Sequence, residues 1–190
     1  MSPSGIDIVV VGASAGGVHA LQAVLGSLPP DWLVPVVCVL HLPRDRPSGL
    51  AALMAHSCAL PVSEAEDKQP IRPGTVVFAP PDYHLLIEDR SSLALSHDAP
   101  VLFSRPAIDV LFESAAIAFG PSVLAILLTG ASADGSDGVA QVRREGGTVW
   151  IQAPEDAVAP TMPASAIAKA GADLILPLDE LCQRLVHSQP

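Results

Sequence analysis

The sequence predicts an α/β fold: a three-layer, doubly wound, mostly parallel sheet with helices on both faces and an antiparallel hairpin at one edge. The almost unbroken β-branched run at residues 8–11 is typical of a strand buried on both faces. A small-residue turn follows it, and residues 18–28 then carry apolar side chains at helical spacing until Pro29. Because strands and helices go on alternating along the chain, a parallel sheet covered on both faces is expected.

The remaining elements follow from the same two patterns, short apolar runs for strands and apolar residues at helical spacing for helices. Pro35 lies near the start of the second apolar run, where a missing donor is tolerated, and the turn Arg72-Pro73-Gly74 separates two short extended pieces at residues 61–67 and 75–79. The expected strands after the first are 34–40, 75–79, 84–88, 93–97, 123–128, 148–151 and 173–176. The expected helices after the first are 47–56, 104–119, 139–145, one from the Pro-rich loop 154–163 to residue 170, and one from residue 179.

Size and charge narrow the function classes. The chain has 190 residues, 49% of them hydrophobic, so a single domain spanning 1–190 is expected. The formal net charge of −10 disfavours binding to nucleic acid or to an anionic membrane surface, because phosphate groups would be repelled. Three cysteines without a C-x-x-C pair, no secretory signal pattern and no membrane-length apolar run together predict a cytoplasmic protein without membrane insertion.

The turn after the first strand carries the first candidate for chemistry. Residues 12–16, G-A-S-A-G, match the G-x-S-x-G nucleophile elbow, in which Ser14 would face outward above the start of a helix. Glycines in such a turn also cradle phosphate groups in dinucleotide-binding domains, so a phosphate-binding module is an alternative. A dinucleotide site prefers an acidic residue at the end of the second strand, where this chain has His41. The histidine in place of an acidic residue favours a catalytic role for this turn over nucleotide binding.

Three strand ends are predicted to bring Ser14, His41 and Asp134 to one edge of the sheet. A serine hydroxyl is a weak nucleophile until a neighbouring imidazole removes its proton, and a carboxylate orients that imidazole. His84 and Asp137 are the competing base and acid. His84 is interpreted as structural, because it begins a hairpin strand away from this edge, and Asp137 as the N-cap of the following helix.

Over residues 6–178 the chain resembles a known family, the CheB-type chemotaxis methylesterase domain. The motifs that carry the resemblance occur in the family's order: G-A-S-A-G-G at Gly12, H-L-P at His41, A-P-P-D-Y-H-L at Ala79, R-P-A-I-D-V-L-F at Arg105, L-L-T-G at Leu127, D-G at Asp134 and M-P at Met162. The resemblance implies a catalytic triad of Ser14, His41 and Asp134. It also implies hydrolysis of glutamate methyl esters on the cytoplasmic helices of chemoreceptors, with release of methanol, and deamidation of receptor glutamines as a second activity.

The resemblance further implies partners and rim residues. A methylated chemoreceptor cytoplasmic domain is the expected partner, and a receiver domain or another regulator is expected on another chain, since no receiver precedes the elbow in this one. Neither a cofactor nor a metal is expected. Ala15, Ala131 and Met162 are the candidates for the oxyanion site and its rim. Arg105 either binds a substrate carboxylate or anchors its loop, and the anchor is the favoured interpretation.

Two departures from the family pattern keep a second hypothesis open. Ala131 stands where the family has a methionine, and the segment at residues 160–163 reads P-T-M-P in place of F-G-M-P. An extra proline stiffens that loop. The alternative is therefore a catalytically impaired relative that binds receptors or signalling partners.

Overall fold

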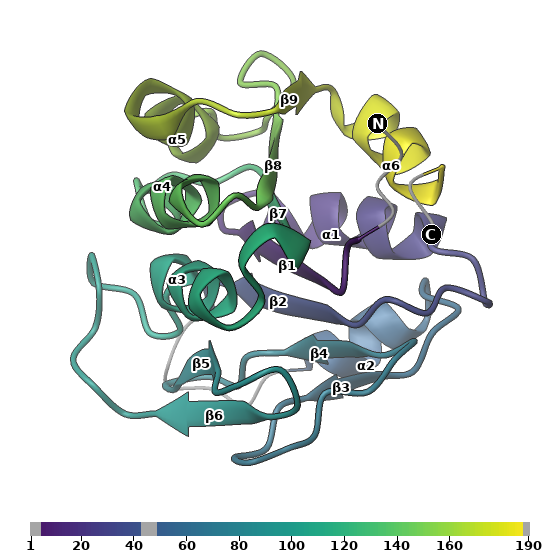
Figure 1. Ribbon diagram of the computed structural model, residues 1–190. Helices are drawn as coiled ribbons and strands as arrows, with labels where there is room; N and C mark the ends of the chain where they lie inside the picture. Colours follow the sequence, from purple (N-terminus) through teal and green to yellow (C-terminus); the bar gives the residue numbers. More distant parts are fainter. Residues whose placement is uncertain (1–4, 43–48, 188–190) are drawn as a thin grey trace.

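The computed structural model describes residues 5–42 and 49–187. The strands of the main sheet are β1 Ile8–Ala13, β2 Val36–Leu40, β3 Val62–Glu64, β4 Val76–Phe78, β7 Val123–Leu127, β8 Thr148–Gln152 and β9 Leu174–Leu176. The helices are α1 Gly17–Ser27, α2 Leu50–Ala55, α3 Ile108–Phe119, α4 Ser136–Arg144, α5 Thr161–Ala170 and α6 Leu178–Val186, with a 3₁₀ turn at Gly120–Ser122. The strands pair in parallel in the order β3-β4-β2-β1-β7-β8-β9 (Figure 1), which confirms the predicted α/β class.

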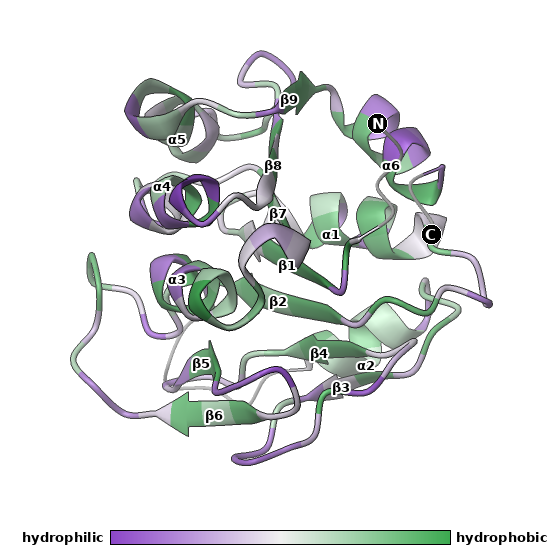
Figure 2. Cartoon of the chain, viewed as in Figure 1, coloured by the Kyte–Doolittle hydropathy of each residue, from purple (hydrophilic) through white to green (hydrophobic). Residues whose placement is uncertain are grey.

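Helices cover both faces of this sheet because its central strands are apolar on both sides. Ile8 and Val10 belong to the core under α3, α4 and α5, whereas Val9 and Val11 belong to the core under α1, α2 and α6. Successive side chains of a strand point to opposite faces, so one β-branched run supplies both cores. Figure 2 shows β1 and β2 in the green of apolar residues, whereas purple, hydrophilic residues gather on α4 and parts of α6.

The predicted hairpin forms, but it does not extend the main sheet. Its strands β5 His84–Ile87 and β6 Leu93–Ser96 pair antiparallel as a separate two-stranded sheet (Figure 1). Leu85, Ile87 and Leu93 are buried in the core that contains α3. The hairpin thus covers apolar surface on one side of the molecule, and β3 remains the edge strand of the parallel sheet.

Several predicted boundaries shift. Helix α3 begins at Ile108, four residues after the predicted start, and α4 begins at Ser136, three residues before it. The N-cap of α4 is Gly135, so Asp137 lies in the first turn and pairs with Lys169, which corrects its prediction as an N-cap. The prediction that the second helix begins at Pro47 lies outside the described residues, and α2 is seen from Leu50.

The strand order places a ligand crevice at the carboxyl ends of the central strands. The chain runs from β1 to β2 on one side, whereas β7 joins β1 on its other side. In an open α/β sheet this reversal leaves a crevice at the carboxyl ends of the strands. The segments that follow β1, β2 and β7 therefore meet there, and these segments carry Ser14, His41 and Asp134.

Candidate active site

Ser14 lies in the tight connection between β1 and α1. Its amide donates to the carbonyl of Thr129 at 2.9 Å, which ties this turn to the segment after β7. The two flanking glycines have separate roles. A Cβ on Gly12 would lie 2.4 Å from Cγ2 of Ile108, so only glycine allows α3 to approach β1 this closely, and Gly16 has a φ of 78°.

The structure brings the three predicted side chains together. The hydroxyl of Ser14 lies 3.1 Å from Nδ1 of His41, and Nε2 of His41 lies 2.7 Å from Oδ2 of Asp134. The His41 side chain is 14% exposed and Asp134 is fully buried, so solvent reaches the base but not the carboxylate. A hydroxyl, an imidazole and a carboxylate are thus in the hydrogen-bond order that nucleophilic catalysis requires.

The hydrogen bonds around Asp134 keep its carboxylate ionised. Burial alone would raise the pKa of Asp134, but hydrogen bonds from His41 and from the amides of Asp109 and Ile108 outweigh burial and lower that pKa below its ordinary value. These two amides donate at 2.9 Å to Oδ1 and at 2.7 Å to Oδ2, respectively. Because they belong to the start of α3, the helix fixes the carboxylate that faces His41.

The ionised carboxylate determines which ring nitrogen of His41 is basic. Asp134 can only accept hydrogen bonds, so Nε2 of His41 carries the proton that lies between them, and Nδ1 keeps its lone pair toward Ser14. In the serine-protease template Nε2 faces the serine and Nδ1 faces the aspartate, so the two ring nitrogens of His41 exchange places relative to that template. The proton-accepting role of the imidazole is the same in both orientations.

Asp109 is a second buried carboxylate that the sequence did not single out. Burial and the neighbouring Asp134 charge raise the pKa of Asp109 to about 7. Its Oδ1 accepts hydrogen bonds from the amides of Gly135 and Gly138 at the start of α4, at 2.9 and 2.8 Å. Asp109 therefore joins α3 to the turn that carries Asp134. A carboxylate within the apolar helix pattern was the only available signal of this role.

His84 and Arg105 occupy structural positions. His84 is buried, with Nε2 3.1 Å from the carbonyl of Ala99, and its Nδ1 accepts a hydrogen bond from the amide of Ala107 at 3.2 Å. Both ring nitrogens are therefore occupied by backbone groups. Arg105 binds the carboxylate of Asp82 at 2.7 Å and donates to two backbone carbonyls, which holds its loop in place as predicted.

The three rim candidates lie in different surroundings. Ala15 and Ala131 are exposed, on loops joined by a hydrogen bond from the Thr129 hydroxyl to the Ala15 carbonyl. Met162 is fully buried, its side chain packs under Gly130, and its amide donates to the Gly130 carbonyl at 2.9 Å. Met162 supports the loop from below, which differs from its predicted place at the rim.

Thr129 is a further residue that holds the Ser14 turn. Its hydroxyl donates to the Ala15 carbonyl at 2.8 Å and accepts a hydrogen bond from the amide of Ala159 at 2.8 Å. Its own amide donates to the side chain of Gln152 at 3.0 Å. One buried hydroxyl thus joins the nucleophile turn to the loop before α5. Its signal in the sequence was its place directly after a buried strand.

Replacing Thr129 with valine is expected to lower the free energy of unfolding by about 1–3 kcal/mol, because valine keeps the shape but leaves the Ala15 carbonyl and the Ala159 amide without this partner. The Ser14 turn loosens as a result, and a fall in kcat of roughly tenfold is expected from the misplaced nucleophile. Urea denaturation and steady-state hydrolysis of an activated ester measure the two effects. Thr75→Val, which removes an exposed hydroxyl bonded to the Arg72 carbonyl, is the control. Equal stability losses in both variants would contradict this role.

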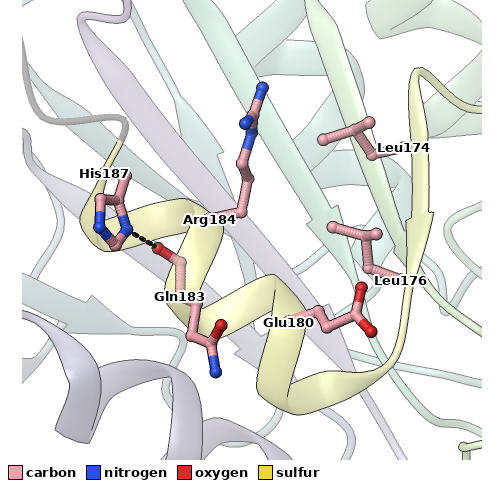
Figure 3. A pocket seen from close by; sticks show the side chains of 6 residues that line it. All are labelled: Leu174, Leu176, Glu180, Gln183, Arg184 and His187. Carbon is pink, nitrogen blue, oxygen red and sulfur yellow. Dashed lines mark hydrogen bonds between the residues drawn. The ribbon is translucent and has the colours of Figure 1, made fainter.

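A cleft of about 360 Å³ opens beside the Ser14 hydroxyl. Ser14, Gly16, His41 and Leu42 line it together with residues of the first turns of α1. A larger hollow of about 720 Å³ lies between β9 and α6 (Figure 3), and its lining residues include none of the three site residues. In that hollow Nδ1 of His187 lies 2.6 Å from the Gln183 carbonyl within the same helix. The smaller cleft is therefore the one that has two of the three predicted site residues, Ser14 and His41, in its wall.

The described residues contain neither a metal-type side-chain cluster nor a membrane-length apolar helix. No group of three or more histidine, cysteine, aspartate or glutamate residues within residues 5–42 and 49–187 is arranged to hold a metal ion. No helix in the same part of the chain is long and apolar enough to cross a membrane.

Fold and site together define the class of protein as a hydrolase built on a parallel α/β sheet. The family model for the CheB methylesterase matches residues 9–185, and the chain belongs to this family. The crystal structure of the Thermotoga maritima CheB methylesterase catalytic domain superposes with a TM-score of 0.90 at 33% identity, covering 95% of this chain and 97% of that one. These matches confirm the family resemblance and the predicted fold.

Curated relatives agree with this assignment. A putative protein-glutamate methylesterase/protein-glutamine glutaminase of Leptospira interrogans is 36% identical, over 95% of this chain and 94% of its own length. A protein-glutamate methylesterase/protein-glutamine glutaminase of a Nocardioides strain is 42% identical over 98% of this chain but 52% of its own length. The chain thus spans nearly all of the first relative and about half the length of the second.

Proposed function

We propose that this chain is a serine esterase that hydrolyses glutamate methyl esters on the cytoplasmic helices of chemoreceptors. The observation that carries the proposal is the hydrogen-bonded series Ser14–His41–Asp134 in a CheB methylesterase family member. The names of the relatives support the same substrate, and they add deamidation of protein glutamine as a second reaction. Its place of action is then the cytoplasm, where the receptor helices lie, and a regulator on another chain is a further expected partner.

The first half of the reaction uses the basic nitrogen of His41. Nδ1 takes the hydroxyl proton of Ser14 as Oγ attacks the ester carbonyl, and Asp134 stabilises the imidazolium through Nε2. The tetrahedral oxyanion forms above the start of α1, where first-turn amides have no partner within the helix. The amides of Ala15 and Gly16, in the turn just before this helix, are candidate donors. Nδ1–H then protonates the methoxide, and methanol leaves an acyl-Ser14 intermediate.

The second half releases the glutamate side chain. Nδ1 accepts a proton from water while the water oxygen attacks the acyl carbonyl, and the same proton returns to Ser14 as the carboxylic acid departs. With a glutamine substrate, ammonia leaves in the first half in place of methanol. The ester and the amide substrate differ only in the group that leaves in the first half. The same three residues therefore serve both substrates.

Methanol release tests the proposal directly. Purified protein is mixed with a methylated chemoreceptor cytoplasmic fragment, and methanol is measured by gas chromatography beside an unmethylated fragment. We expect release that requires both the methyl ester and Ser14, so that Ser14→Ala stops it while Ser57→Ala, an exposed hydroxyl bonded to the Met54 carbonyl, does not. Binding of the fragment without methanol release would contradict the esterase and support the binding-module alternative.

A further inference from the structure

Nδ1 of His41 lies near a second hydroxyl besides that of Ser14, the hydroxyl of Ser104. Ser104 Oγ lies 3.5 Å from Nδ1 of His41, against 3.1 Å for Ser14 Oγ. Nδ1 has a single lone pair, so the nearer Ser14 hydroxyl takes the strong hydrogen bond in the resting site. The half-buried Ser104 hydroxyl is a polar group beside the base that the first half-reaction leaves unused.

The backbone holds Ser104 firmly in this place. Val101 and Ser104 exchange two backbone hydrogen bonds, at 3.0 and 2.7 Å, around a two-residue turn formed by Leu102 and Phe103. Their φ angles are 46° and 67°, in the left-handed region that bulky residues rarely adopt. Arg105 fixes the next position through the Asp82 carboxylate. Strain of this kind persists where the surroundings determine the backbone, and here it places a hydroxyl beside His41.

The chemistry at Nδ1 changes once Ser14 is acylated. Its oxygen then belongs to an ester and has no proton to donate, so the hydrogen bond from Ser14 to His41 is lost. A water molecule must take that position with one O–H directed at Nδ1 and its oxygen directed at the acyl carbonyl. Ser104 is the hydroxyl already within reach of the same nitrogen.

We propose that Ser104 positions the hydrolytic water for deacylation. Its hydroxyl hydrogen-bonds the water that stands at Nδ1 of His41. The water proton passes to Nδ1 as the water oxygen bonds to the acyl carbon, and the bond from that carbon to Ser14 Oγ then breaks as the proton returns to Ser14. This role rests on the proposed serine esterase chemistry, but it does not depend on which protein carries the ester.

The test separates the two half-reactions with p-nitrophenyl acetate. Wild type and Ser104→Ala are mixed with the ester in a stopped-flow instrument, and p-nitrophenol release is followed through the burst and the steady state. Ser104→Ala is expected to keep the burst rate within about twofold and to lower the steady-state rate about 10- to 100-fold, the usual cost of a misplaced reactant. Ser104→Thr, which keeps a hydroxyl, should recover most of the loss.

Two further measurements distinguish a water-positioning role from a merely structural one. Hydroxylamine attacks an acyl-enzyme without needing a positioned water, so added hydroxylamine should restore turnover in Ser104→Ala more strongly than in wild type. Ser91→Ala removes a hydroxyl from the turn between β5 and β6, where it bonds Asp89, and should change neither phase.

The outcomes also distinguish a failure of the Ser104 role from a failure of the proposed receptor substrate. Equal steady-state rates in wild type and Ser104→Ala, or a loss of the burst and steady-state rates in the same proportion, would overturn the role of Ser104. A slowed second phase with no methanol release from methylated receptor would support Ser104 and overturn the receptor substrate. The absence of Ser14-dependent release of both p-nitrophenol and methanol in wild type would overturn both.

Discussion

Replacing His41 with alanine is expected to lower kcat for ester hydrolysis by about 10⁴-fold, the upper range for a positioned general base, with a larger loss if the three residues act as a unit. Without the imidazole, Ser14 keeps its proton, and Asp134 is left as a buried charge without its side-chain partner. Hydrolysis of an activated ester at neutral pH measures kcat. Circular dichroism shows that the variant is folded, and added imidazole should restore part of the activity.

Two other histidines serve as controls for this loss. His19 lines the same cleft on the exposed surface of α1 but takes no part in the hydrogen-bonded series of Ser14, His41 and Asp134, so His19→Ala is expected to keep kcat within about twofold. His84→Ala should instead lower the free energy of unfolding by about 1–3 kcal/mol, because the buried amide of Ala107 and the carbonyl of Ala99 lose their partner. The folded His84 variant should keep its kcat. A larger loss of kcat in the folded His84→Ala variant than in His41→Ala would show that His84, and not His41, is the base.

The sequence predicts the candidate triad well because of a general property of parallel sheets. Residues that follow successive parallel strands come to the same edge whatever their separation in the chain. Ser14, His41 and Asp134 each come directly after a buried apolar run or a few residues beyond it, so their meeting could be expected without knowing the strand order. The side-chain distances confirm that they converge, while their catalytic roles stay predictions until the variants are measured.

The surrounding residues could not be predicted in the same way. The role of Asp109 depends on amides of Gly135 and Gly138, which follow another strand, so no pattern within α3 reveals it. The turn before Ser104 is harder still, because two-residue hairpins with positive φ favour Asn-Gly, and this one contains Leu102 and Phe103. Tertiary contacts override local preference in both cases.

The same reason explains the errors in the outer elements. Alternating apolar residues predict the hairpin correctly, but only packing decides whether it joins the main sheet or covers α3. For α4, the residues before Val139 are small and polar, and the helix starts early because Asp109 accepts the amides of its first turn. Long-range hydrogen bonds therefore set the boundaries nearest the site.

Asp134→Asn tests the orientation of the imidazole and is expected to lower kcat about 10⁴-fold, the scale known for the equivalent change in a serine protease. Oδ2 of Asp134 accepts hydrogen bonds from His41 and Ile108, and Oδ1 accepts one from Asp109. An asparagine cannot accept all three. If its NH₂ group faces His41, it donates to Nε2, the ring proton moves to Nδ1, and the nitrogen beside Ser14 is no longer a base.

The opposite amide orientation keeps the tautomer but directs the NH₂ group at the Asp109 amide, so two donors face each other in a buried place. Either orientation therefore lowers activity or stability, and kcat and the free energy of unfolding must be measured together. Asp137→Asn is the matched control, because this exposed carboxylate also follows β7 and pairs with Lys169. A folded Asp134→Asn protein with kcat within tenfold of wild type would show that Asp134 does not orient His41. An equal loss of kcat in Asp137→Asn would show that the loss does not come from the buried carboxylate.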